Sequence, residues 1–167
     1  MNKTELFNNE IGELLPESTH HFLSNKWSLH QLFSWILSQI GPSKVYLSTY
    51  SISEVAIRTF MYEVDKGNIL ELNCLFDYSI KKNKLHLLMF ANNITSEIRL
   101  INNHSKIILF ENDNMNLVVN TSANFNTNLR IEAGVISTKK AIYEQYLEVF
   151  LKFYNESIPL EFDKYED

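Results

Sequence analysis

One short stretch, His104-Ser105-Lys106, places an imidazole and an ammonium group at alternate positions where an apolar run begins. Alternate residues of a strand share a face, so both side chains are expected to point the same way. A nucleophilic or proton-transferring imidazole beside a fixed ammonium suits chemistry on an anionic phosphodiester. A later stretch, Thr121-Ser122-Ala123-Asn124, can supply neutral hydrogen bonds to the same centre.

Short runs of β-favouring residues surround both stretches and are expected to position them. A polar turn of Asn and Asp residues at 112–114 separates two of these runs. The predicted strands are 97–101, 107–110, 117–119 and 130–136. His104 therefore lies between two strands, and Ser122 directly follows another.

Together these residues resemble the HxK…(G/T)SxN signature, the HKD-type motif, of the phospholipase D superfamily, over about residues 45–150. In the family an acid follows the Lys by five residues, and Glu111 stands there in place of the usual Asp. The Asn-rich stretch and the Glu that come after the SxN are matched by Asn128 and Glu132. Thr121 stands where a Gly usually precedes the Ser, and the gap after Glu111 is longer than the commonest pattern. The motif occurs once, whereas the large enzymes of the family carry two copies.

The resemblance implies an α/β fold, a phospholipase D-like sandwich in which a mixed, largely parallel central sheet is flanked by helices. The order helix, strand, helix, strand in the first half of the chain also implies crossovers and parallel pairing. In such a fold strand ends meet near the active site. Ser48 and Thr49, at the end of a predicted strand over 44–50, are therefore expected to bind substrate together with Thr121.

The resemblance further implies a mechanism that uses neither a metal ion nor another cofactor. His104 would attack phosphorus to form a phosphohistidine, and Lys106 would neutralise the non-bridging oxygens. Asn124 and Ser122 would add hydrogen bonds to those oxygens. Glu132 would accept from the other nitrogen of His104 and fix its tautomer. A second His must protonate the leaving oxygen, so a homodimer with one composite site across a two-fold interface is expected.

The composition is that of one ordinary globular domain, with 167 residues of which 45% are hydrophobic and 21% charged. Cys74 is the only cysteine, which excludes an intramolecular disulfide and a Cys-based metal site and favours a buried structural thiol. The N-terminus lacks a signal-peptide layout and no apolar run is long enough to cross a bilayer, so we expect a cytoplasmic protein without membrane contact. Because the net charge is −5, binding of nucleic acid (DNA or RNA) would depend on a local basic cluster of Lys81, Lys82, Lys84 and Lys106.

Three segments are predicted along the chain. Residues 1–25 are expected to be an N-terminal arm or a short helix over Leu14-Leu15, residues 26–158 the phospholipase D-like domain, and residues 159–167 an acidic C-terminal tail. Periodicity and end signals predict a helix from Ser28 to Gly41, one from Ser53 to about Gly67 with Val55 among its core positions, and one over 139–155. Residues 84–90 fit either a helix or a strand. The last helix carries an apolar stripe that is expected to be core or interface rather than a base-stacking platform: Ala141, Ile142, Tyr146, Val149, Phe150 and Phe153.

The favoured function is a phosphodiesterase (a hydrolase) that acts as a nuclease rather than on lipid headgroups. The alternative is a catalytically degenerate binding or scaffolding domain, which Thr121 and the longer gap would permit. Simpler interpretations also exist for the single residues. Glu132 could pair with Arg130 on a strand surface, and Ser122 with Asn124 could form an ordinary turn.

Overall fold

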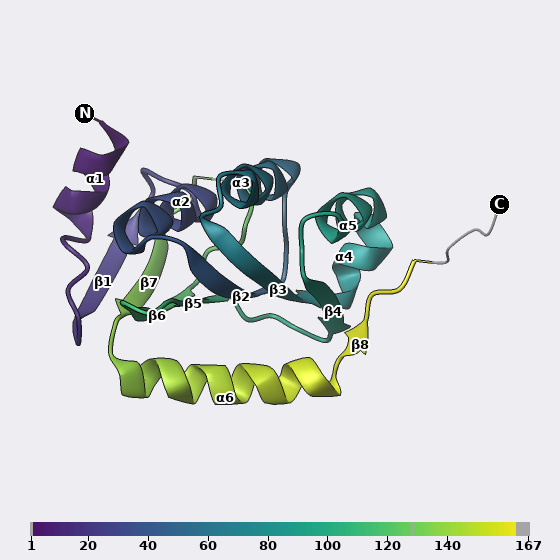
Figure 1. The fold of residues 1–167 in the computed structure, drawn as a ribbon. Coiled ribbons are helices and arrows are strands. Elements are labelled where there is room, and N and C mark those ends of the chain that lie inside the picture. The colour runs from purple at the N-terminus through teal and green to yellow at the C-terminus, as the bar shows by residue number, and fades with distance from the viewer. Residues whose placement is uncertain (1, 128, 163–167) are drawn as a thin grey trace.

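Helices cover both faces of one mixed sheet within residues 2–127 and 129–162, the part of the chain that the computed structural model describes (Figure 1). Helix α6 lies along one face, and the other helices lie on the opposite face. The helices are α1 (Lys3–Glu10), α2 (Leu29–Ile40), α3 (Glu54–Asp65), α4 (Tyr78–Asn83), α5 (Leu85–Asn92) and α6 (Lys140–Glu156). The strands are β1 (Thr19–Ser24), β2 (Ser43–Thr49), β3 (Ile69–Asp77), β4 (Glu97–Ile101), β5 (Ile107–Glu111), β6 (Asn116–Thr121), β7 (Glu132–Ser137) and β8 (Ile158–Pro159). The predicted α/β sandwich is confirmed.

Among the described residues the sheet has eight strands in the order β1-β7-β6-β5-β2-β3-β4-β8. Parallel pairing joins β2 to β3 and β3 to β4, where helical crossovers return the chain to the same edge. The remaining neighbours pair antiparallel. The sheet is thus mixed, as expected, but its parallel part is restricted to three strands. The short connections that link β5, β6 and β7 allow only antiparallel pairing.

Helix α2 shows how the local sequence sets its own limits. The backbone N–H of Ser28 donates to Oε1 of Gln31 at 3.0 Å, and Gly41 ends the helix with φ of 86°. Ser53 caps α3 with its own side chain, whose Oγ accepts from the backbone N–H of Ala56 at 3.3 Å. The predicted starts of both helices are confirmed. Val55, expected in the core, is instead 45% exposed, because the buried line of α3 runs through Ala56, Ile57 and Phe60.

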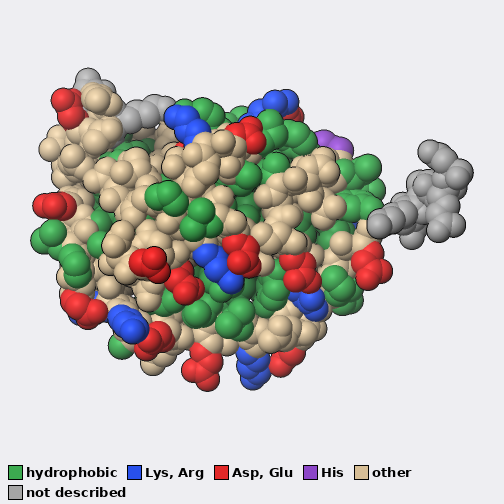
Figure 2. Space-filling view, viewed as in Figure 1, with side chains coloured by type: hydrophobic (Ala, Val, Ile, Leu, Met, Phe, Trp, Pro, Cys, Tyr) green, Lys and Arg blue, Asp and Glu red, His purple; other side chains and the backbone are tan. Residues whose placement is uncertain are grey.

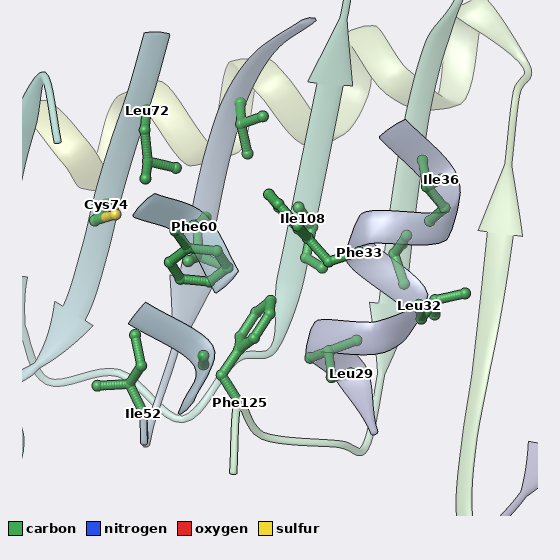
Figure 3. Packing of buried hydrophobic residues seen from close by; sticks show 14 of the residues in the cluster. Leu29, Leu32, Phe33, Ile36, Ile52, Phe60, Leu72, Cys74, Ile108 and Phe125 are labelled. Atoms are coloured by element: carbon green, nitrogen blue, oxygen red, sulfur yellow. The ribbon is translucent and has the colours of Figure 1, made fainter. Parts of the chain in front are cut away.

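The main core lies between the sheet and α2, α3 and α5. Figure 3 shows Phe33, Phe60 and Phe125 turned toward one another, and the Phe33 and Phe60 ring centroids lie 4.9 Å apart. Phe125 directly follows Asn124, so this packing fixes the end of the stretch 121–124 against the core. Cys74 is fully buried in the same cluster, as predicted, and burial raises the pKa of its thiol.

A second core forms between α6 and the other face of the sheet. Its buried residues on the helix are Tyr143, Phe150 and Tyr154. Val149 and Phe153, which the sequence placed in a core or an interface, are 53% and 45% exposed in the single chain. Phe150 of the predicted stripe is buried, and Ile142 and Tyr146 pack against the same core, so the stripe is confirmed in part.

The first 25 residues are more closely tied to the sheet than an arm would be. Helix α1 precedes Leu14 rather than covering it, and β1 pairs along its whole length with β7. Trp27 Nε1 donates to Oε2 of Glu10 at 2.7 Å, which holds α1 against α2. At the other end of the chain, β8 pairs with β4, and residues 163–167 of the predicted acidic tail lie outside the described residues. The boundaries of the three predicted segments stay predictions. Residues 85–92, left open as helix or strand, form a helix.

Gly134 in β7 is required by close approach. A Cβ there would lie 2.3 Å from Cζ of Phe22 and 2.8 Å from the backbone oxygen of Asn120. We expect Gly134→Ala to lower the free energy of unfolding by roughly 1–3 kcal/mol through overpacking. Urea denaturation would measure the loss, with the neighbouring exposed Ala133→Ser as a control. An unchanged midpoint for Gly134→Ala would show that β7 moves freely away from β6.

No described helix combines the length and the apolar character that crossing a membrane requires.

Candidate functional site

His104 and Lys106 lie in the loop that joins β4 to β5, with Lys106 immediately before the first residue of β5. The side chain of His104 is exposed, whereas Lys106 is only 8% exposed. Nζ of Lys106 donates to the backbone oxygen of His104 at 2.7 Å and lies 3.1 Å from its Nδ1. An ammonium group has no lone pair, so Nδ1 accepts in this contact. The predicted neighbours are therefore in direct contact.

Tyr50, directly after β2, packs against both groups. Its ring centroid lies 4.8 Å from that of His104, and Nζ of Lys106 lies 5.8 Å from the centre of the Tyr50 ring. An ammonium at that distance from a tyrosine face is attracted by the ring quadrupole. The aromatic ring thus limits the positions that both the imidazole and the ammonium can take.

Ser122 and Glu132 form a second pair, on the loop after β6 and at the start of β7. Oγ of Ser122 donates to Oε2 of Glu132, and the N–H of Ala133 donates to the same Oγ at 3.1 Å. The carboxylate of Glu132 also acts electrostatically on Lys106, so its negative charge lies near that ammonium. The predicted hydrogen bond between Glu132 and His104 stays a prediction. In the single chain the carboxylate of Glu132 accepts a hydrogen bond from Ser122.

Asn124 and Thr121 complete this loop in different ways. Oδ1 of Asn124 is buried and has no hydrogen-bond partner among the described residues. A buried acceptor of this kind is costly unless a donor arrives from outside. Thr121 is 8% exposed; its hydroxyl donates to the backbone oxygen of Ala133 at 2.9 Å and accepts from the N–H of Ala123 at 3.1 Å. Thr121 thus stabilises the turn, and substrate binding by its side chain stays a prediction.

Burial lowers the pKa of Lys106 below its usual value, and the nearby negative charge of Glu132 partly opposes this shift. The ammonium is therefore less well solvated than a surface lysine. A poorly hydrated cation at the mouth of a site interacts more strongly with an incoming anion. The arrangement can bind a phosphodiester oxygen and stabilise additional negative charge on it.

Asn103 anchors the loop that carries His104. Its side chain is 7% exposed, and Nδ2 donates to Oγ of Ser48 at 2.9 Å and to the backbone oxygen of Leu75 at 3.0 Å. Oδ1 accepts from the N–H of Ser105 at 2.9 Å and from its hydroxyl at 2.7 Å. The hydroxyls of Ser48 and Ser105 also lie 2.5 Å apart. Both neighbours of His104 are thus held to the ends of β2 and β3.

Asp77, the last residue of β3, holds the same loop through its carboxylate. Oδ2 accepts from the backbone N–H of Asn103 at 2.9 Å, and Oδ1 accepts from the N–H of Ser79 at 2.8 Å. Burial alone would raise the pKa of Asp77, but these hydrogen bonds and the nearby His104 outweigh it and hold the pKa below its usual value. The ionised carboxylate is therefore the form that fits the folded loop.

We expect Asn103→Ala to lower the free energy of unfolding by about 2–4 kcal/mol, because several buried partners lose their hydrogen bonds together. Hydrolysis, if present, should fall further than the change in folded fraction explains, since the position of His104 depends on the same bonds. Chemical denaturation and activity at matched folded fraction would measure the two effects. Asn102→Ala, at an exposed neighbour, serves as the control for stability. A loss of stability that is equal in both variants would contradict the anchoring role.

The other predicted residues occupy distinct positions. Ser48 belongs to the Asn103 network, and Thr49 is fully buried with its hydroxyl donating to the backbone oxygen of Ser51 at 3.0 Å. Glu111 lies at the far end of β5 from Lys106, where it accepts from the hydroxyl of Tyr143 at 2.8 Å. Nζ of Lys84 donates to the backbone oxygen of Ile52 at 2.7 Å, which ties this residue of the predicted basic cluster to the chain. Asn128 lies outside the described residues.

Sequence reasoning missed Tyr50, Asp77 and Asn103 as parts of the site. Tyr50 directly follows β2, Asp77 ends β3, and Asn103 lies two residues after β4. This position was the available signal, because strand ends on one edge of a sheet meet in space. Within residues 2–127 and 129–162, no group of three or more His, Cys, Asp or Glu side chains is arranged to hold a metal ion.

A scan against protein-family models and a search of curated proteins by sequence found no match. Solved structures do match. Nuc from Salmonella typhimurium, a phospholipase D family member, has a TM-score of 0.67 and 18% identity over 87% of this chain and 99% of its own. NucT from Helicobacter pylori has a TM-score of 0.68 and 14% identity over 86% and 99%. TrmBL2, an archaeal chromatin protein described with a novel mode of DNA binding, has a TM-score of 0.59 and 13% identity over 93% of this chain and 59% of its own. The chain therefore has a phospholipase D-like fold.

Proposed function

We propose that this chain, with its phospholipase D-like fold, is a nuclease-like phosphodiesterase that needs neither metal nor cofactor. One observation carries the proposal: the buried ammonium of Lys106 directly contacts the exposed imidazole of His104. That pair combines a nucleophile with a cation in position for the charge that develops on phosphorus. The similarity of the fold to Nuc agrees with this chemistry.

In the proposed reaction a nitrogen of His104 attacks phosphorus. The new N–P bond forms as the bond from phosphorus to the leaving oxygen breaks, and a second His gives its proton to that oxygen. The same His then takes a proton from water, whose oxygen attacks phosphorus and breaks the N–P bond. The products are an alcohol and a phosphate monoester, and both His residues return to their starting forms.

Lys106 turns in this scheme from Nδ1 of His104 to the non-bridging oxygens of the substrate. Its contacts support this role, because the ammonium is already close to the imidazole and is poorly solvated. The move releases Nδ1, and the ring proton transfers through water from Nε2 to Nδ1. Nδ1 then donates to the carboxylate of Glu132 and orients the ring, while Nε2 carries the lone pair that attacks phosphorus. Ser122, released from Glu132, and the amide N–H of Asn124 add hydrogen bonds to the phosphate oxygens.

The second His comes from a second copy of the chain, in a homodimer whose two-fold axis places the two His104 side chains opposite each other. Mixing tests this arrangement. If both imidazoles are required, activity after exchange with inactive His104→Ala protein should fall with the square of the wild-type fraction. A linear fall would mean that each chain works alone. Sedimentation equilibrium of each pure protein gives the required check that the variant still dimerises.

Nucleic acid is the proposed substrate, as short or single-stranded segments rather than long duplexes. The net charge of −5 provides no general attraction to a polyanion. Figure 2 shows basic side chains on this face standing among acidic ones, including along the lower edge over α6. Because the net charge supplies no field that draws a polyanion, a substrate that needs only one or two phosphate contacts fits best. A cytoplasmic location stays part of this proposal.

Hydrolysis of bis(p-nitrophenyl) phosphate and of single- and double-stranded DNA, with chelator present, tests the activity. We expect turnover that the chelator does not reduce and that favours single strands. No turnover on any of these substrates would remove the proposal.

One observation favours a second candidate, a binding domain that has the fold without the chemistry. In the single chain Glu132 accepts from Ser122, and Thr121 is locked into the turn beside it. TrmBL2 shares the fold and is described as a DNA-binding chromatin protein. Binding of single-stranded DNA without any hydrolysis, unchanged by His104→Ala, would identify this second function.

A further inference from the structure

A pocket of about 590 Å³ opens between the sheet and the C-terminal half of α6, and His104 is one of the residues that line it. Its walls include the aromatic side chains of Tyr146, Phe150 and Phe153. The volume is in the range of sites for small molecules, roughly 300–1,000 Å³. The mechanism above uses His104 but none of the other residues that line this pocket.

The lining contains no Lys, Arg, Asp or Glu, and its polar groups besides the imidazole of His104 are amides and hydroxyls. Asn102 and Gln145 are both exposed, and neither side chain hydrogen-bonds to another described residue. The pocket thus combines flat aromatic walls with available amide donors and acceptors. That combination suits a planar ring with a polar edge, since aromatic faces stack on bases and amides pair with their edges.

We propose that this pocket binds the base of a nucleotide next to the phosphodiester that His104 attacks. The proposal rests on the proposed nuclease function and deepens it, because it makes an unstacked base part of substrate recognition. A base held in the pocket is unpaired, so the substrate class is single-stranded nucleic acid. Stacking also supplies binding free energy that the acidic chain cannot obtain from phosphate contacts.

An alkyl chain is a poorer occupant than a base. It would fill the aromatic part of the pocket, but it would also cover the amides of Asn102 and Gln145 without offering them partners. Leaving amide groups buried and unpaired weakens binding. A base edge satisfies the same groups, so the amides at the pocket favour the nucleotide.

Fluorescence polarisation in a His104→Asn background tests the pocket without turnover. The two probes are a labelled five-residue oligothymidylate and the same backbone with every base removed. We expect the base-bearing probe to bind at least about 5-fold more tightly. Phe153→Ala and Val149→Trp, two independent changes to the exposed wall, should abolish this preference and leave binding of the abasic probe unchanged. Glu148→Ala, on the same helix but outside the pocket, is the matched control.

Equal binding of the two probes would overturn the pocket assignment, and so would a preference that survives both wall variants. Displacement of the oligonucleotide by dihexyl phosphate, lost in the same variants, would assign the pocket to an alkyl chain instead. Hydrolysis by the wild-type protein is measured separately. Its absence would overturn the proposed activity, whereas a base preference abolished by the wall variants would still support the pocket.

Discussion

Replacing His104 with alanine is expected to reduce phosphodiester hydrolysis by roughly 10³- to 10⁶-fold, the scale seen when a covalent nucleophile is removed. The side chain is exposed and its imidazole contacts only Lys106 and Tyr50 in the described hydrogen bonds and ring contacts. The free energy of unfolding should therefore change by less than about 1 kcal/mol. Initial rates on bis(p-nitrophenyl) phosphate and single-stranded DNA, with chelator present, would measure the effect.

His86→Ala is the matched control for this prediction, because His86 is also an exposed imidazole but lies on α5. It should retain wild-type turnover. Equal activity in wild type and His104→Ala would point to a contaminating enzyme. Trapping of a phosphorylated protein with a slow-leaving substrate, seen in wild type and lost in His104→Ala, would support the phosphohistidine step separately.

Replacing Lys106 with methionine is expected to lower kcat by about 10²- to 10³-fold, since a preorganised cation is removed from the charge that develops on phosphorus. The same change should leave the protein as stable as wild type, or more stable by up to roughly 2 kcal/mol. The reason is that an 8% exposed ammonium gives way to a side chain of similar length that burial does not penalise. Steady-state kinetics together with thermal unfolding would show the two opposite effects. A large loss of stability would instead identify Lys106 as a structural residue.

The pH dependence of the rate gives a second measurement on Lys106. The protonated form is the active one, so activity falls as pH rises through its pKa. Because burial lowers the pKa of Lys106, the alkaline limb should lie below the ordinary lysine value of about 10.4. The charge of Glu132 opposes that shift, and Glu132→Gln should therefore move the limb to still lower pH. If the alkaline limb of the pH–rate profile does not move in Glu132→Gln, a group other than Lys106 controls that limb.

Local sequence was sufficient for most of the elements around the site. Alternating and continuous apolar runs predicted the strands that flank His104, and each of β4 to β7 is found within a few residues of its expected range. Ser28 and Ser53 marked the starts of α2 and α3, because a hydrogen-bonding side chain at a helix start acts on its own neighbouring backbone. These signals are short-range, so the chain carries them without reference to the fold.

The side chains that hold the site were not predictable in the same way. Asn103 is an ordinary polar residue in the sequence, and its importance comes from Ser48 and Leu75, which lie 55 and 28 residues away along the chain. Asp77 depends likewise on a loop 26 residues further on. The face of α6 that packs on the sheet was predicted only in part, because periodicity gives a helix an apolar side but only packing selects which residues of that side are covered.

By itself, then, the sequence determined the strands that flank the site and the motif that places His104, Lys106, Ser122 and Glu132 at strand ends, whereas β1 and β8 were not predicted. The tertiary structure alone decided which of these groups contact each other. Lys106 contacts His104, Glu132 accepts from Ser122, and Asn103 links the loop before β5 to β2 and β3. Val149 and Phe153 are exposed and line a pocket. The physical reason is that elements form from local hydrogen bonding and periodicity, whereas contacts between side chains depend on how distant strands and helices pack together.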